Sequence, residues 1–272
     1  MDSNVLPLAD HLAETPSAAR MYDYYLGGHH NFEVDRIAAE HVISLYPESR
    51  LVALANRAFL RRAVTFLVQQ GIDQFLDLGS GIPTVGNVHL IAQQLNPEAR
   101  IVYVDIDPVA VAHSAALLAH NPCATIVQAD VRQIDALLAM PIVHEMLDFR
   151  RPVAVLTIAL LHFITDDAEV AQLLHRLRAG LVPGSYLAIG HGTHDEIPPD
   201  AVAQIEQLYR RTSHAVRMRP AATIHSFFDG LELVEPGMVY APLWRPEDEA
   251  DILLDQPARS INLVGVGRVR EP

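Results

Sequence analysis

The sequence predicts a doubly wound α/β fold: a mostly parallel seven-stranded sheet with an antiparallel C-terminal hairpin and an N-terminal helical extension. Between residues 74 and 189, five short apolar runs alternate with amphipathic runs, a pattern typical of parallel strands with helices on both faces of the sheet. After residue 190 this rhythm changes to two further strand-like runs with a long connection, which suits antiparallel strands added at the sheet edge.

Each element follows from local patterning. Residues 1–70 are expected to form the helical extension, with a turn at 26–28 and a final helix at 50–70 that Gly71 closes. The five parallel strands are expected at 74–78, 101–105, 125–128, 153–159 and 186–189, with helices at 87–95, 108–120, 134–139 and 167–179 between them. A helix at 201–211 and strands at 231–239 and 261–268 complete the ligand-binding domain, 71–272, which forms one structural unit with the extension.

Composition excludes several function classes. The 272 residues carry a net charge of −13, which argues against nucleic-acid or anionic-membrane partners because both need a cationic surface. All 20 basic residues are arginine, so a Schiff-base lysine and a phosphate-loop lysine are excluded. The arginines at 210, 211, 217 and 219 are expected to lie on a solvated helix face. The single cysteine, Cys123, and an N-terminus without a basic, apolar leader favour the cytoplasm.

The segment 75–83, FLDLGSGIP, carries the main functional signal. In doubly wound sheets, ligands bind beyond the carboxyl ends of the strands, and glycines in the first strand-loop let a ligand approach the backbone. Gly79, Ser80 and Gly81 form this loop here. Asp77 lies at the strand end, where its carboxylate can hold an ammonium group or shape the loop through backbone N–H groups.

Carboxylates also end the next two strands. Asp105 is placed to accept both ribose hydroxyls of a nucleoside, and Asp130 to meet the exocyclic amine of adenine. The competing interpretation is that these residues are helix N-caps, as expected for Asp107 before Pro108. A dinucleotide fingerprint would need glycine at position 84, which is threonine. The pattern therefore predicts S-adenosylmethionine as the cofactor.

The chain resembles the S-adenosylmethionine-dependent methyltransferases of the Rossmann-like class, and more narrowly a bacterial S-adenosyl methyltransferase family once catalogued as a domain of unknown function. The matching segments are 20–28 (RMYDYYLGG), 31–32, 35–36, 56–62 (NRAFLRR), 74–89, 102–113 and 151–163. Pro83 departs from the broad class, where a third glycine is often found. The resemblance implies an S-adenosylmethionine-dependent methyltransferase. The acidic chain and a long lid disfavour DNA or RNA as the acceptor, so a small molecule is the expected acceptor.

The resemblance also implies roles for single residues. Gly79, Ser80 and Gly81 would line the methionyl and ribose region, and Asp105 would bind the ribose. Ile106 would pack on adenine, with Asp130 and Val131 at its edge, while Ala159 and Leu160 would face the methyl group and 20–31 would form a lid. Without lysine, the methionyl carboxylate needs an arginine or backbone groups, and Arg57 and Arg20 are the candidates.

Catalysis by positioning can supply most of the acceleration of an in-line methyl transfer. A general base is needed only for a protonated acceptor, and His162, just past the fourth strand, is placed for that role with an ordinary pKa near 6.5. The alternative is a packed histidine. Tyr22 and Tyr25 could contact the sulfonium or the acceptor, or pack in the lid. No metal site is predicted, the oligomeric state stays open, and a cofactor-binding sensor without transferase activity remains the alternative function.

Overall fold

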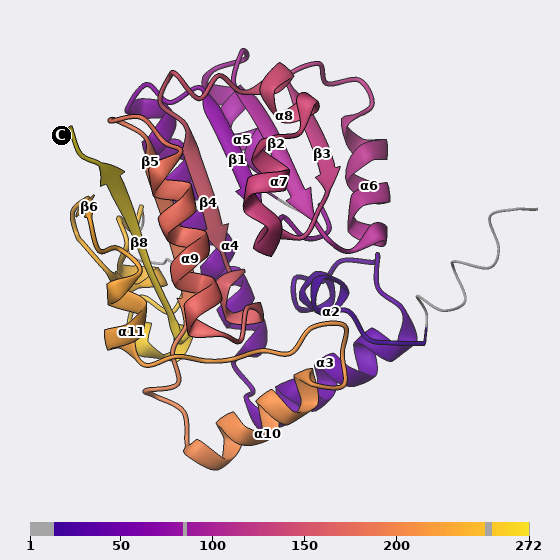
Figure 1. The fold of residues 1–272 in the computed structure, drawn as a ribbon. Coiled ribbons are helices and arrows are strands. Elements are labelled where there is room, and N and C mark those ends of the chain that lie inside the picture. Colours follow the sequence, from indigo (N-terminus) through magenta and orange to yellow (C-terminus); the bar gives the residue numbers. More distant parts are fainter. Residues whose placement is uncertain (1–13, 84–85, 248–251, 272) are drawn as a thin grey trace, which may run out of the picture.

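The structure is a computed structural model that describes residues 14–83, 86–247 and 252–271. In these ranges, one sheet has the strand order β3-β2-β1-β4-β5-β8-β6, with β7 also paired to β8 (Figure 1). The strands are β1 (Gln74–Leu78), β2 (Arg100–Asp105), β3 (Ala124–Gln128), β4 (Ala154–Ile158), β5 (Tyr186–Gly192), β6 (Leu231–Leu233), β7 (Val239–Tyr240) and β8 (Asn262–Val269). β1 to β5 are parallel, and β8 runs antiparallel to β5, so the predicted fold class is confirmed.

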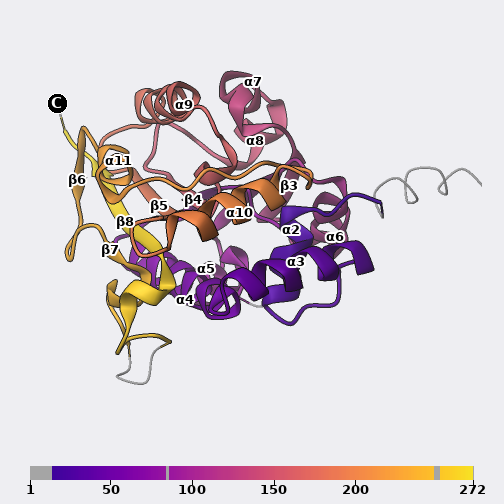
Figure 2. The same cartoon turned by 90° about the horizontal axis from the view of Figure 1, so that it is seen from below.

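Helices cover both faces of the sheet (Figure 2). One face carries α7 (Ile134–Leu138), α8 (Pro141–Met146), α9 (Asp167–Ala179) and α11 (Ala221–Ser226), and the other carries α4 (Ser49–Gln69), α5 (Val88–Leu95) and α6 (Pro108–Leu118). Alternate residues of each strand enter the two cores: Leu76 and Val102 belong to the core on the side of α7, α8 and α9, whereas Phe75 and Ile101 belong to the core on the side of α4, α5 and α6. Within the described ranges, every helix is too short or too polar to cross a bilayer.

Three helices lie beyond the carboxyl ends of the parallel strands: α2 (Ala18–Tyr25), α3 (Glu33–Leu45) and α10 (Pro199–Tyr209) (Figures 1 and 2). We call these three helices the helical cap. Met21, Tyr25 and Val42 are buried between α2 and α3, and Leu208 and Tyr209 of α10 pack against the same cluster. Segments more than 150 residues apart in sequence therefore close over one end of the sheet.

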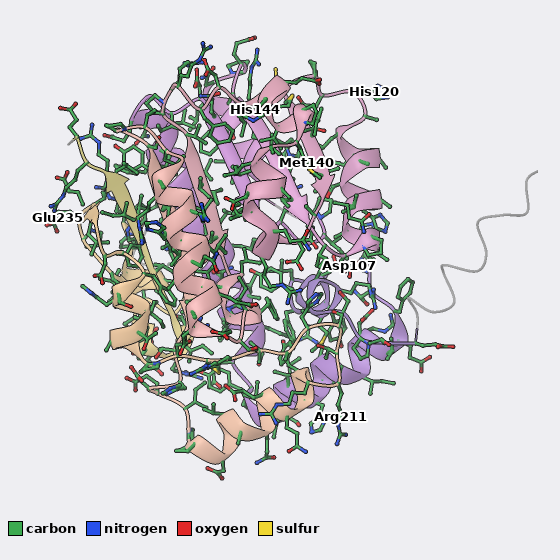
Figure 3. The ribbon with its side chains drawn as sticks, viewed as in Figure 1. Asp107, His120, Met140, His144, Arg211 and Glu235 are labelled. Atoms are coloured by element: carbon green, nitrogen blue, oxygen red, sulfur yellow. The ribbon has the colours of Figure 1, made fainter. Side chains whose placement is uncertain are left out.

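A buried ionic cluster fastens the cap to the sheet. The Arg20 guanidinium of α2 donates from Nε to Asp35 Oδ2 over 2.7 Å and lies 3.5 Å from Asp107 Oδ2. Asp107 follows β2 and lies beside α2 (Figure 3), where it also accepts a hydrogen bond from the Ser17 hydroxyl. Asp107 additionally accepts from the backbone N–H of Val109, so the predicted helix cap at the start of α6 is confirmed.

The C-terminal hairpin differs from its prediction in one respect. The expected strand 231–239 is interrupted, because Pro236 has no N–H to donate and Gly237 has a φ of 86°. The chain loops out between β6 and β7, and both pair with successive parts of β8. The short helices α8 and α11 were not predicted because six residues carry too little periodicity.

Short 3₁₀ turns complete the chain: η1 (Val131–Gln133), η2 (Leu161–Phe163), η3 (Ala241–Leu243) and η4 (Pro257–Ser260). η1 follows β3 and η2 follows β4, so both turns lie at the carboxyl edge of the sheet.

Candidate functional site

A cavity of about 290 Å³ lies between the helical cap and the carboxyl ends of the parallel strands. Almost all of the predicted site residues line it: Tyr22, Arg57, Asp77, Gly79, Ser80, Gly81, Asp105, Ile106, Asp130, Val131, Ala159, Leu160 and His162. The remaining candidate, Arg20, does not line the cavity. The fold therefore brings together residues that are up to 140 positions apart in the sequence.

The turn after β1 has the conformation that its glycines predict. Gly79 and Gly81 have φ values of 71° and 66°, in the left-handed region that side chains disfavour. A Cβ at Gly79 would also lie 2.6 Å from Leu160 Cδ1, so the turn after β1 and the turn after β4 are in contact. The Gly79 and Ser80 N–H groups both donate to the Val104 carbonyl, at 2.8 and 3.1 Å, which ties the turn to β2.

Asp105 at the end of β2 holds the glycine turn from the other side. Its Oδ2 accepts a 2.7 Å hydrogen bond from the Gly81 N–H, and its Oδ1 accepts one of 2.9 Å from the Asp107 N–H. Each carboxylate oxygen has a second lone pair to offer a ligand hydroxyl. Burial raises the pKa of Asp105, while these backbone N–H groups lower it.

Asp77 is the other buried carboxylate at this end of the cavity. Burial raises its pKa to about 7, the nearby Arg57 guanidinium lowers it, and the Asp105 carboxylate raises it. A buried carboxylate in this state gains from a cationic partner. The predicted interaction with an ammonium group fits this environment.

Asp130 combines the two interpretations that the sequence left open. Its side chain accepts from the Arg132 N–H and caps η1, so it is a helix cap, and it also lines the cavity. Its Oδ2 lies 2.5 Å from Arg132 Nη2, and this hydrogen bond lowers its pKa. The neighbouring Ile106, 38% exposed, presents an apolar surface to the same part of the cavity.

Five side chains that line the cavity contain a buried polar atom without a hydrogen-bond partner among the described residues: Tyr25 Oη, Asn56 Oδ1, Arg57 Nε, Ser80 Oγ and His162 Nδ1. Buried polar atoms are almost always paired in folded proteins, so a group of unpaired ones around one cavity is typical of a ligand site. Asn56 was not predicted, because a single polar residue in a long helix carries no distinguishing signal.

The two candidate arginines differ in environment. The structure gives Arg57 neither an ion pair nor a hydrogen bond to any described residue, and its guanidinium lies over the Tyr22 ring, 5.4 Å from the ring centroid. Arg20 instead pairs with Asp35 and Asp107, and its Nη2 donates to the Thr15 carbonyl over 2.6 Å. The prediction of Arg20 as a cofactor ligand is therefore corrected: its guanidinium holds the cap. Arg57 remains the candidate.

His162 lines the cavity from η2, but its predicted ordinary pKa is wrong. Burial, together with the nearby Arg219 guanidinium, lowers its pKa to about 4. The imidazole is therefore neutral at pH 7. Its ring centroid lies 5.5 Å from that of His191, in an edge-to-face arrangement.

Arg219 supports the turn that carries His162. The sequence predicts that this arginine lies on a solvated helix face, and this prediction is wrong. Only 1% of its side chain is exposed, because the chain after α10 folds back beneath η2. Its guanidinium donates to the carbonyls of Leu161 and Ile164, at 3.1 and 2.7 Å, and thus holds both ends of the turn that carries His162. It also lies 2.8 Å from Asp167 Oδ1 and 3.0 Å from His191 Nε2.

Tyr22 is held in place by its neighbours. Its hydroxyl donates to the Ala53 carbonyl over 3.2 Å and accepts from Asn56 Nδ2 over 2.9 Å. These bonds use the hydroxyl, so the Tyr22 ring rather than its hydroxyl is available to a ligand. Within the part of the chain that the structure describes, no group of three or more His, Cys, Asp or Glu side chains is arranged to hold a metal ion.

Comparison with known proteins identifies the family to which this sequence belongs. The sequence model of a family described as S-adenosyl methyltransferase matches residues 9–270. No curated protein has a significant match to the sequence.

Solved structures agree with the family match. A chain from Thermobifida fusca, provisionally described as a methyltransferase, is 39% identical with a TM-score of 0.89, and the match covers 99% of this chain and 100% of that one. A DUF574 family protein from Streptomyces avermitilis is 38% identical with a TM-score of 0.87, covering 94% and 98%. An O-methyltransferase family protein from Burkholderia thailandensis has 14% identity and a TM-score of 0.53, covering 97% of this chain and 68% of that one, and shares the fold alone.

Proposed function

Because the chain belongs to the S-adenosyl methyltransferase family, we propose that it transfers the methyl group of S-adenosylmethionine to a small-molecule acceptor bound beneath the helical cap. The observation that carries this proposal is the convergence of the Gly79–Gly81 turn, the buried Asp105 carboxylate and the unpaired Arg57 on one cavity. The cofactor supplies a methyl group already activated on a sulfonium sulfur.

The residues of the cavity fit this cofactor. The Asp105 carboxylate would accept the two ribose hydroxyls, and Ile106, Asp130 and Val131 would surround the adenine. Gly79 and Gly81 would expose backbone to the ribose and methionyl groups, beside the unpaired Ser80 hydroxyl.

The methionyl end would meet opposite charges. We assign its ammonium to Asp77 and its carboxylate to Arg57, whose interaction within the protein is a ring contact with Tyr22. In this role Tyr22 is a positioning residue, because its hydroxyl is anchored to Ala53 and Asn56 while its ring supports the guanidinium. Ala159 and Leu160, at the end of β4, would border the methyl group.

A small molecule fits better than a macromolecule as the acceptor. Residues of α2, α3 and α10 line the cavity over the strand ends, so an acceptor has to enter beneath the cap. The net charge of −13 opposes a nucleic-acid partner. His162, neutral at pH 7, can take up a proton that the acceptor releases.

Isothermal titration calorimetry tests the cofactor part of this proposal. Wild-type protein should bind S-adenosylmethionine and S-adenosylhomocysteine, and Asp105→Ala should bind both about 100-fold more weakly, because hydrogen bonds to a charged group contribute about 1.5–3 kcal/mol each. Asp229→Ala, which removes an exposed carboxylate outside the cavity, is the matched control and should bind as wild type does. Absence of binding, or equal effects of the two substitutions, would refute the assignment.

A cofactor-binding sensor is the alternative function, and turnover distinguishes it. Release of S-adenosylhomocysteine should rise when a mixture of small-molecule acceptors is added to protein with S-adenosylmethionine. Tight binding of both ligands without release on a broad acceptor panel would favour the sensor.

A further inference from the structure

Charge is unevenly distributed around the cavity. Every carboxylate that lines it, among the described residues, follows β1, β2 or β3: Asp77, Asp105, Asp107 and Asp130. The opposite half, lined by α10, the segment 214–218, Ile261 and β8, contributes none from the described ranges. Of the arginines at the cavity, Arg132 is paired with Asp130, and the proposed function assigns Arg57 to the methionyl carboxylate. A cationic acceptor in the opposite half would therefore lack a carboxylate counter-ion.

The same half is rich in apolar and aromatic side chains. Tyr46 of the segment after α3, Phe163 of η2 and Tyr209 of α10 present rings to the cavity. Ile205 and Met218 line it between them, and Ile261 precedes β8. Such walls favour a flat apolar body, which gains from both area burial and ring contacts.

Polar side chains interrupt this apolar surface, among them His214 and Asn262. Asn56 and His162, which also line the cavity, each contain an unpaired buried atom. Asn56 uses Nδ2 on the Tyr22 hydroxyl and leaves Oδ1 buried without a partner among the described residues. The neutral His162 ring has an unpaired Nδ1. The Asn56 amide oxygen accepts hydrogen bonds, and His162 Nδ1 accepts them in the tautomer that carries the proton on Nε2. The methyl acceptor should therefore carry a hydrogen-bond donor.

We propose that the methyl acceptor is an uncharged, ring-bearing compound that is methylated at a hydroxyl group. An aliphatic amine is protonated at neutral pH and would bring a buried cation without a partner, whereas a hydroxyl supplies the donor without charge. This inference rests on the proposed function, because the neutral acceptor and the cofactor share the cavity.

The transfer step balances with the groups present. The acceptor oxygen forms the new bond to the methyl carbon as the bond from that carbon to sulfur breaks, and the electron pair of the broken bond stays on sulfur. The hydroxyl proton leaves to the His162 imidazole and then to solvent. A weakly basic imidazole suffices, because a hydroxyl becomes strongly acidic as its oxygen acquires the methyl group, and a neutral ring does not repel a neighbouring sulfonium.

Equilibrium dialysis with four matched probes tests this inference. S-adenosylhomocysteine is first titrated alone, and the probes are then measured on the saturated protein: 2-naphthol, 2-methylnaphthalene, 2-naphthoate and 2-naphthylmethylamine. We expect 2-naphthol to bind about tenfold more tightly than 2-methylnaphthalene, as one hydrogen bond predicts, and the two charged probes to bind about 100-fold more weakly than 2-naphthol.

An Asn56→Leu variant assigns the hydrogen bond. It should remove most of the preference for 2-naphthol over 2-methylnaphthalene. Because Asn56 Nδ2 also anchors Tyr22, the affinity of this variant for S-adenosylhomocysteine is measured separately, and the probes are compared on protein saturated with that ligand. Asn96→Leu, outside the cavity, should keep the preference.

Each outcome is decisive. Failure of S-adenosylhomocysteine to bind removes the proposed function and this inference with it. If S-adenosylhomocysteine binds normally, the proposed acceptor class alone is overturned in either of two cases: a charged probe binds as tightly as 2-naphthol, or 2-naphthol does not bind. Adding S-adenosylmethionine in place of S-adenosylhomocysteine should yield 2-methoxynaphthalene, detected by mass spectrometry.

Discussion

Gly79 and Leu160 meet so closely that a Cβ on the glycine would lie 2.6 Å from the leucine Cδ1. The two residues follow β1 and β4, the central strands of the sheet, so their contact defines the floor of the cavity. We expect Gly79→Ala to force Leu160 aside and to weaken binding of S-adenosylhomocysteine at least about tenfold, in addition to a backbone cost of about 1–2 kcal/mol for a φ of 71°.

Gly71→Ala is the matched control for this substitution. Gly71 has a φ of 86° and open space around its Cβ position, so the variant carries the same kind of backbone cost without a clash. Calorimetry and thermal unfolding should show both variants destabilised and only Gly79→Ala impaired in binding. Equal affinity of the two variants would contradict a cavity floor formed by Gly79 and Leu160.

The buried Asp77 carboxylate is predicted to lower the free energy of unfolding near neutral pH while it contributes to binding of the cofactor. Its pKa of about 7 in the fold exceeds its ordinary value of 3.8, so the folded state holds a proton that the unfolded state has lost. The stability from this proton is complete below pH 3.8 and disappears as the pH rises through 7. Asp77→Asn mimics the protonated side chain at every pH. Between pH 5 and pH 8, wild type should lose roughly 3 kcal/mol relative to Asp77→Asn.

Urea unfolding at the two pH values measures this difference. Asp229→Asn changes an exposed carboxylate and should follow wild type at both. The stabilised Asp77→Asn protein should nevertheless bind S-adenosylhomocysteine more weakly at pH 8, because a neutral amide cannot pair with the ammonium. A variant that is stabilised and binds normally would remove Asp77 from the cofactor site.

The convergence of three carboxylates at one end of the cavity was predictable from the sequence for a geometric reason. Parallel strands end at one edge of the sheet, so Asp77, Asp105 and Asp130 had to converge once the strands were placed correctly. The glycine turn was predictable because its positive φ values depend on the local sequence alone. Periodicity fixed strand and helix positions to within a few residues.

The remaining features depend on contacts between distant segments. Arg20 looked like a ligand for a carboxylate, and the fold pairs it with Asp107, 87 positions away. The pKa of His162 follows from burial and from Arg219, which lies 57 residues further along the chain. No local pattern separates a buried arginine from an exposed one when both lie in a polar segment.

Asp35 is predicted to hold the helical cap. Its buried carboxylate accepts from the Ser17 N–H, the Phe32 N–H and Arg20 Nε, at 2.7 to 2.8 Å. Asp35→Asn removes the charge that balances the buried Arg20 and one acceptor oxygen, a change that typically costs about 3–5 kcal/mol. We expect faster amide hydrogen exchange in α2 and α3, with exchange in β1, β2 and β4 unchanged.

Glu40→Gln provides the comparison within the same helix. Glu40 pairs with Arg50 over 2.9 Å, but both side chains are about half exposed, and such pairs contribute under about 1 kcal/mol. Exchange in α2 should therefore stay at the wild-type rate. If Asp35→Asn and Glu40→Gln give the same exchange pattern, the buried cluster does not hold the cap.

Arg219 is predicted to be the main support of the turn that carries His162. Its neighbour Arg217 pairs with the same carboxylate, 3.0 Å from Asp167 Oδ2, but its side chain is 47% exposed. Arg219→Met would leave the carbonyls of Leu161 and Ile164 without their buried donor, and we expect a loss of about 3 kcal/mol or more in the free energy of unfolding. Arg217→Met removes an exposed pair and should cost under about 1 kcal/mol. Urea unfolding of both variants measures the contrast, and equal losses would show that pairing with Asp167, rather than the buried contacts to η2, stabilises this turn.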